Sequence, residues 1–322
     1  MRKIKIFENI EIFEIQNESI YAGNKDNLFV YNKYFNLVER YEGHIFYMLK
    51  YKYNLLFRIG NNEITYILNN PNIKELPNTT LMGNFIDGDY MYLLCSDDLI
   101  NKYDKNCNLE NTYNIGRFPK LIFQNKFLRT PNNSIICYDL DSNIQLWQHN
   151  FSDLLEGENV SSSGNILVNN DLLYISLSDW VKGGATFCID VNTGKIVKKL
   201  ETLGFIQLEN DVIYSVHGDE IRTVNTKNFE TKTIQIEELI KEKLYINKSR
   251  WVIQDHLLYF IDGDIMPNNK MGIIDLDTQK LVWQTALTIK GGINHEIKEI
   301  RVQDNRLYAH CADNTLHIFE KE

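Results

Sequence analysis

The most constraining feature of this sequence is a unit of short strands that recurs through its length. In residues 254–284 a polar turn leads into an apolar run at 257–261, and a loop leads to a second run at 271–276. A tight turn then precedes a third run at 280–283. Runs of about five residues separated by Gly, Asp and Asn are typical of antiparallel strands rather than helices. The unit is therefore a β-meander.

An equivalent of Tyr259, in the middle of the first apolar run, recurs at intervals of 35 to 49 residues. Repeats of this length are typical of propeller blades. Each interval holds four short runs, which predict a four-stranded sheet. We expect an all-β, eight-bladed β-propeller of four-stranded antiparallel blades, with seven blades as the alternative count. The eight anchors are Tyr21, Phe57, Tyr92, Arg129, Tyr174, Tyr214, Tyr259 and Tyr308.

The two ends of the chain complement each other. The last repeat stops after the run at 316–319 and lacks its fourth strand, whereas a spare run at 3–7 precedes the first repeat. Pairing these two runs would complete the last blade and remove both exposed sheet edges. The chain has 5 prolines and no Ser/Pro-rich linker. We therefore expect a single domain over residues 1–322, closed by its N-terminal strand.

The turn between the third and fourth runs is the most regular part of the repeat. Asp139 and Trp147 are eight residues apart, as are Asp275 and Trp283. Asp, Asn and Thr at such turns hydrogen-bond nearby backbone amides, and Gly or Asn adopts positive φ. These residues predict one corner that is built in the same way in several repeats.

This corner, an Asp turn with Thr or Ser followed by Trp, resembles the blade signature of the pyrroloquinoline-quinone-like eight-bladed propellers. The resemblance implies the fold, because in that family the Trp docks one blade on the next and marks no active site. The family includes quinone-dependent dehydrogenases and non-catalytic proteins such as the outer-membrane assembly lipoproteins. Most repeats here carry another residue in the Trp position, so no particular member is implied. These residues are Arg40, Thr112, Lys198 and Thr233.

The cysteines argue against the dehydrogenases. The resemblance implies two adjacent cysteines beside the quinone in those enzymes, and this chain has no adjacent pair. Its five cysteines lack CxxC spacing and lie mostly inside predicted strands, so we expect buried free thiols in a reducing cytoplasm. We therefore expect no cofactor, neither a quinone nor another group. The cysteines are Cys95, Cys107, Cys137, Cys188 and Cys311.

The charge of the chain excludes some classes of partner. With 34 basic and 43 acidic residues the formal net charge is −9, and no basic cluster suggests a nucleic-acid ligand. An acidic surface favours a basic protein partner. The first ten residues alternate polar and apolar, which is typical of a strand and not of a secretion signal. We expect a cytoplasmic monomer with no membrane contact.

Residues that often carry chemistry are present without the spacing that chemistry needs. His217, His295 and His310 lie at strand ends that reach one rim, but no metal-ligand spacing joins them. The segment 262–264 begins like a calcium loop, and the apolar residues at 265–267 break the ligand order. No nucleophile elbow or phosphate loop appears. We expect no catalytic residue and no metal site.

Insertions are confined to the second half of the repeats. Three precede a first strand and two join a second strand to a third, and in an antiparallel blade both kinds of connection emerge on one rim. The segment 237–245 has Leu239, Ile240 and Leu244 at near-helical spacing and predicts a short helix. The insertions are residues 153–164, 179–185, 236–249, 263–270 and 288–297.

Two of these insertions carry large apolar residues that suit partner anchors. Interface energy concentrates in a few side chains of this type, so a Trp or a Met in a polar loop indicates a contact surface. The alternative is that Trp180 folds back over the edge of its blade as a cap. The predicted partner-binding residues are Trp180, Val181, Lys182, Met266, Pro267 and His295.

Together these patterns predict a protein-binding module without chemistry of its own. A concrete form is an immunity-type inhibitor that captures a basic toxin, such as a nuclease, through loops on one rim. One alternative is an enzyme that uses the propeller channel, either a quinone-dependent dehydrogenase or a carbohydrate-active enzyme. A second is a scaffold for assembly, contacted along the blade edges.

Overall fold

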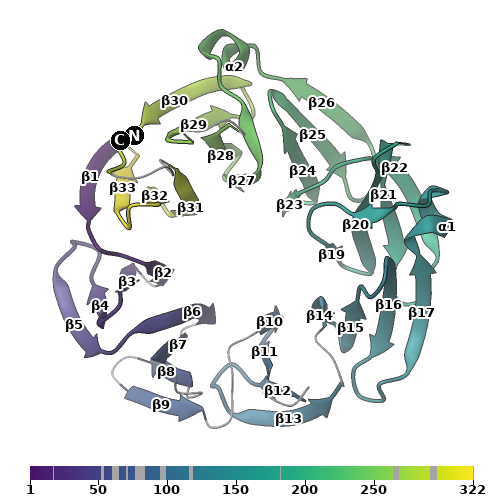
Figure 1. Ribbon diagram of the computed structural model, residues 1–322, viewed down its shortest axis with the longest axis horizontal. Helices are drawn as coiled ribbons and strands as arrows, with labels where there is room; N and C mark the ends of the chain where they lie inside the picture. The colour runs from purple at the N-terminus through teal and green to yellow at the C-terminus, as the bar shows by residue number, and fades with distance from the viewer. Residues whose placement is uncertain are drawn as a thin grey trace. The chain divides into compact units, whose positions relative to one another are not determined.

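A computed structural model describes residues 1–16, 18–51, 54–59, 65–69, 72–76, 84–94, 99–115, 119–181, 183–263, 268–290 and 296–321. These residues form an all-β propeller fold of antiparallel sheets (Figure 1). Seven sheets are the expected four-stranded blades, and an eighth sheet has five strands. The two helices among the described residues are short, and neither could cross a membrane.

Contacts within the backbone divide the chain into two compact units. The N-terminal unit comprises Ile10–Asn150 and Val191–Gly194. The C-terminal unit comprises Met1–Asn9, Phe151–Asp190 and Lys195–Glu322. Each unit contains four of the sheets.

The N-terminal unit has four sheets of four consecutive strands, each sheet following the chain in order. The first two sheets are β2 (Ile12–Gln16), β3 (Ser19–Gly23), β4 (Asn27–Tyr31), β5 (Leu37–Glu42), then β6 (Ile45–Tyr51), β7 (Asn54–Ile59), β8 (Thr65–Asn69) and β9 (Asn72–Leu76). The next two are β10 (Asn84–Asp87), β11 (Tyr90–Leu94), β12 (Leu99–Tyr103), β13 (Leu109–Asn114), then β14 (Leu121–Phe123), β15 (Lys126–Arg129), β16 (Ser134–Asp139) and β17 (Gln145–Asn150).

The C-terminal unit adds helices and an extra strand to the same plan. Its five-stranded sheet has α1 (Phe151–Leu155) before it and contains β18 (Ser161–Ser162), β19 (Leu167–Asn169), β20 (Leu172–Asp179), β21 (Gly183–Asp190) and β22 (Ile196–Glu201). The next sheets are β23 (Ile206–Glu209), β24 (Val212–His217), β25 (Glu220–Asn225), β26 (Thr231–Gln235), then, after α2 (Glu237–Glu242), β27 (Ile246–Gln254), β28 (Leu257–Asp262), β29 (Lys270–Asp275) and β30 (Lys280–Ala286). The last sheet contains β31 (Ile297–Gln303), β32 (Arg306–Cys311), β33 (Leu316–Glu320) and β1 (Arg2–Phe7).

The hairpin that joins each inner strand to the strand after it has the same register in all eight sheets. Its closing pair is always three residues apart, as in Gln16↔Ser19, Gln254↔Leu257 and Gln303↔Arg306. A two-residue hairpin turn needs positive φ at its first central position in type II′ and at both central positions in type I′, and Asn, Asp and Gly tolerate this best. Asn210 and Asp211 show this conformation, with φ of 48° and 64°. Local turn chemistry therefore fixes the register of each repeat.

This register corrects two of the predicted anchors. Tyr259 is the third residue of its strand, but the third residues of β7 and β15 are Leu56 and Leu128. Phe57 and Arg129 each follow by one position, and successive side chains of a strand point to opposite faces. Leu56 packs in one hydrophobic cluster with residues of the following sheet, whereas Phe57 packs in the cluster of the preceding one.

The predicted corner between the third and fourth strands is present, and its Trp residues dock as the resemblance implies. Trp147 is 8% exposed, and its Nε1 donates a hydrogen bond to Val191 O at 2.8 Å. A Cβ at Gly194, where φ is +71°, would lie 2.6 Å from the indole of Trp147. In the C-terminal unit, Trp283 meets Phe319 edge to face, with ring centroids 5.4 Å apart.

The N-terminal strand completes the last sheet, as predicted. β1 pairs antiparallel with β33, from Arg2↔Glu320 to Phe7↔Leu316. Phe7 is buried, and Lys3 Nζ lies 5.6 Å from the centroid of the Phe319 ring. The strand that the C-terminal repeat lacks is therefore supplied from the other end of the chain.

Candidate functional site

The predicted insertions belong to the C-terminal unit, and both kinds of connection meet at the same end of its sheets. Tyr245 precedes β27 and Gly263 follows β28, and Gly263 N donates a hydrogen bond to Tyr245 O. In the same way, Leu287 N donates to Asn269 O at 2.8 Å. We call this surface the insertion face, defined by the described residues of 151–164, 179–185, 236–249, 263–270 and 287–297.

The hairpin of β20 and β21 presents Trp180 and Val181 at its tip, where their exposed fractions are 95% and 89%. Asp179 fixes the base of this tip. One carboxylate oxygen of Asp179 accepts a hydrogen bond from Val181 N at 2.8 Å, and the other accepts from Asn159 N at 3.4 Å. The neighbouring Gly157 lies so close that a Cβ there would be 2.6 Å from Asp179 Oδ2. The tip is therefore tied to the insertion that precedes the sheet.

Two of the six predicted partner-binding residues fall within the described part of the chain. Because the Trp180 side chain is almost fully exposed, the indole does not fold back over the edge of the sheet. Lys182, Met266, Pro267 and His295 lie outside the described residues.

The predicted helix in the 236–249 insertion is confirmed as α2, and its C-cap residue, Lys243, is in the left-handed conformation. Leu239 and Leu244 are buried in a cluster with Trp251, so the helix is anchored on the sheet below it. Ile240 is 58% exposed and does not join this apolar face. Adjacent residues of a helix point about 100° apart, so Leu239 and Ile240 cannot both face the core.

The predicted rim histidines do not form a common site. His217 is exposed and its ring lies 6.0 Å from that of Tyr245. His310 is buried, with Nδ1 3.9 Å from a carboxylate oxygen of Glu299. His295 is outside the described part of the chain. Within that part, no group of three or more His, Cys, Asp or Glu residues is arranged to hold a metal ion.

The described cysteines are buried and free. Burial raises the pKa of the Cys188 thiol to about 11, and it raises the pKa of Cys137 and of Cys311 to about 12. A thiolate is the nucleophilic and metal-binding form of cysteine. These thiols therefore stay protonated at neutral pH and serve as core side chains.

The carboxylates at the repeated corners are occupied by backbone amides. Hydrogen bonds from the hydroxyl and the amide of Ser142 hold the pKa of the Asp139 carboxyl below its ordinary value. The amide of Thr278 lowers the pKa of Asp275 in the same way. These aspartates close turns, as the sequence predicts.

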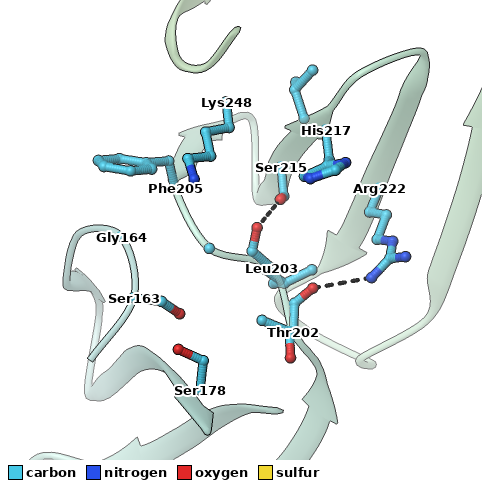
Figure 2. Close-up of a pocket in the computed structure, with 12 residues that line it drawn as sticks. Ser163, Gly164, Ser178, Thr202, Leu203, Phe205, Ser215, His217, Arg222 and Lys248 are labelled. Atoms are coloured by element: carbon cyan, nitrogen blue, oxygen red, sulfur yellow. Dashed lines mark hydrogen bonds between the residues drawn. The ribbon is translucent and has the colours of Figure 1, made fainter. Parts of the chain in front are cut away.

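A cavity of about 400 Å³ opens beside the insertion face, between the ends of β20, β24 and β27 (Figure 2). Its lining contains Arg222, His217 and Lys248 but no Asp or Glu among the described residues. The sequence gives little signal for it, because residues from three sheets and from the loop before β23 form it together. The remaining lining residues are Ser163, Gly164, Ser178, Thr202, Leu203, Gly204, Phe205, Ser215 and Val216.

Comparison with known proteins gives the fold and no more. No family model and no curated protein matches the sequence. Among solved structures, the computationally designed Ika8 protein has a TM-score of 0.63 and 11% identity, over 98% of this chain and 96% of that one. BamB from Moraxella catarrhalis has a TM-score of 0.59 and 13% identity, over 99% of both chains. At these identities the likeness supports a β-propeller fold, and no family model confirms the pyrroloquinoline-quinone-like family.

Proposed function

We propose that this chain is a non-catalytic protein-binding module whose partner docks on the insertion face of the C-terminal unit. The observation that carries this proposal is the hairpin tip of β20 and β21, where Trp180 is 95% exposed and Val181 is 89% exposed. A propeller scaffold holds loops rigidly, and binding residues are often placed on such loops.

The geometry of the tip suits a binding anchor. Trp is enriched among the few residues that dominate interface energies, because it buries a large area with only two side-chain torsions to fix. Asp179 bonds both to the backbone of the tip and to Asn159. A tip that is already ordered loses less conformational entropy on binding.

The charge around the tip favours a basic partner. The insertion that packs against Asp179 carries exposed acidic side chains at Asp153, Glu156 and Glu158. The chain as a whole has a net charge of −9. Complementary charge speeds association and selects partners. In its specific form, the proposal is an immunity-type inhibitor that captures a basic toxin, such as a nuclease.

The test compares three forms of the protein: the natural sequence, Trp180→Ala, and Tyr34→Ala. Tyr34 is a matched control because it is also an exposed aromatic residue at a turn, 71% exposed, but it lies in the N-terminal unit. Proteins that bind the immobilised protein of natural sequence are identified and purified. Their affinities for all three forms are then measured by titration. We expect Trp180→Ala to weaken binding by about 2 kcal/mol or more, and Tyr34→Ala to leave it unchanged.

Two further readouts separate the general proposal from its specific form. Binding of a basic partner should weaken as salt concentration rises. If the bound protein is a nuclease or another toxin, its activity should fall in proportion to the complex formed. Equal affinity of all three forms for every bound protein would refute docking at the tip, and loss of inhibition with intact binding would refute only the inhibitor role.

A further inference from the structure

The cavity beside the insertion face has a positively charged lining, although the protein as a whole is acidic. Its three ionisable lining residues are Arg222, Lys248 and His217, and no described carboxylate lines it. Leu203, Phe205 and Val216 supply an apolar part of the wall. We propose that this cavity binds a small anionic ligand, in which a carboxylate or phosphate group is attached to an apolar or aromatic body.

The wall of the cavity is fixed before any ligand arrives. The backbone of Leu203 and Gly204 is held by three buried hydroxyl groups on neighbouring strands. Leu203 N donates to Thr186 Oγ1 at 2.9 Å, and Gly204 N donates to Ser176 Oγ at 3.1 Å. Ser215 Oγ donates to Leu203 O, which Figure 2 shows beside the cavity. A site held in this way keeps its binding groups in place without a cost of reordering.

The loop that contains Gly164 lies against the backbone of Gly204 on the other side of the cavity wall. Gly164 has a φ of +85°, and a Cβ there would lie 2.2 Å from Gly204 O. Only glycine permits this contact between two backbones. The two loops therefore form one continuous wall.

The side chains of Arg222 and Lys248 still have hydrogen-bond donors that a ligand could use. Arg222 is oriented by Glu220, which accepts from Nε, and by Thr202 O, which accepts from Nη1 at 3.0 Å. Its Nη2 has no hydrogen-bond partner among the described residues. Lys248 Nζ likewise has no described ion-pair partner. Glu220 and Glu201 offset the charge of Arg222, so Lys248 supplies the excess positive charge.

A hydroxyl on the other side of the cavity lacks a partner. Ser163 Oγ is buried, and no described group forms a hydrogen bond with it. Figure 2 shows Ser163 and Ser178 on one side of the cavity, with Arg222 and His217 on the other. A buried hydroxyl without a partner costs about 1 to 3 kcal/mol, which an acceptor oxygen of a ligand would recover. An anion between these sides would meet charged donors and hydroxyl donors together.

The experiment uses three probes that share a phenyl ring: benzoate, phenyl phosphate and the neutral benzyl alcohol. Each is titrated calorimetrically into the full chain, into Lys248→Gln, and into Lys280→Gln. Lys280 is an exposed lysine of the same unit, at the start of β30 and outside the cavity lining. We expect saturable binding of at least one anion, weaker binding at higher salt, and no comparable binding of the alcohol.

Lys248→Gln should weaken binding of the anion about tenfold or more, since a hydrogen bond to a charged group is worth about 1.5 to 3 kcal/mol. Lys280→Gln should bind as the natural sequence does. The stronger of the two anions identifies the preferred head group. No saturable binding of either anion, equal binding of the alcohol, or unchanged binding by Lys248→Gln would overturn the proposal. The inference is independent of the partner, because Trp180→Ala should still bind the anion.

Discussion

The N-terminal and C-terminal units are built from the same antiparallel sheet but differ in the connections at one end of it. In the N-terminal unit two to seven residues separate one sheet from the next, with two between Glu42 of β5 and Ile45 of β6 and seven between Leu76 of β9 and Asn84 of β10. In the C-terminal unit ten residues separate Gln235 of β26 from Ile246 of β27, and ten separate Ala286 from Ile297. The strand cores tolerate this difference because the added residues lie beyond the strand ends. The additional residues therefore lie on the insertion face, outside the strand cores, which is where binding loops of rigid scaffolds usually lie.

The largest effect should come from removing residues 1–8. This deletion takes β1 from the last sheet, with buried Phe7 and the ladder from Arg2↔Glu320 to Phe7↔Leu316. We expect a loss of about 4 kcal/mol or more in unfolding free energy, with lower solubility, since β33 becomes an exposed edge. Hydrogen exchange should speed up in β31–β33 and remain slow in β6 and β7. A truncated protein that melts like the parent would show that this pairing contributes little.

A second comparison concerns the two docked Trp residues, one in each unit. Trp147 is buried and hydrogen-bonded to Val191 O, whereas Trp283 is only partly buried against Phe319. Trp147→Ala should lower the unfolding free energy by about 3 to 4 kcal/mol, and Trp283→Ala by about half as much. Urea denaturation of the two variants gives both values. Equal losses of unfolding free energy would mean that the Trp corner stabilises both units to the same extent.

Acid should weaken the C-terminal unit through His317. This side chain is 4% exposed, and burial, together with the charge of Lys3, lowers its pKa to about 4. The unfolded chain has its histidine pKa near 6.5, so between about pH 6.5 and 4 it binds a proton that the folded chain does not. Stability should therefore fall by roughly 3 kcal/mol as the pH falls through this window, and no further below it.

Urea denaturation at pH 7, 5 and 4 measures this loss. His317→Gln should remove this part of the pH dependence. His44→Gln, at a half-exposed histidine of the N-terminal unit, is the control and should retain it. The same slope in all three proteins would exclude His317 as the source.

The smallest effect on stability should come from the exposed aromatic residues. Trp180→Ala and Tyr34→Ala remove side chains that are 95% and 71% exposed. Each should change the unfolding free energy by less than about 0.5 kcal/mol, because little buried surface is lost. Thermal melting of both variants checks this expectation. A clear loss for Trp180→Ala alone would make the tip part of the folded core instead of a contact surface.

The repeat plan was predictable because its signals are local. Turn residues such as Asp139 and Asn210 set each hairpin within a few positions, so strand order and the β1–β33 pairing follow from the sequence. The anchors Phe57 and Arg129 were each one position wrong, since apolar residues on both faces hide the period of two. β18 was missed because Ser161 and Ser162 form a strand only by pairing with the long β20.

The two candidate sites, the Trp180 tip and the cavity, also differ in whether a single segment of the sequence reveals them. Trp180 could be singled out because a large apolar residue in a polar insertion is unusual within a single segment. The cavity could not, because Ser163, Arg222 and Lys248 come from separate sheets and are ordinary residues in their own segments. Only the packing of three strand ends and the close approach of Gly164 to Gly204 bring them together.

The pairing of β1 with β33 also constrains the order of folding. Arg2 and Glu320 are partners across almost the whole chain, so their ladder is among the most non-local contacts in the molecule. Non-local strand pairs form slowly. During synthesis β1 therefore has to wait, unpaired, until β33 has emerged. Arg2, Lys3 and Lys5 give this unpaired strand a positive charge, and like charges disfavour its pairing with the same strand of another nascent chain.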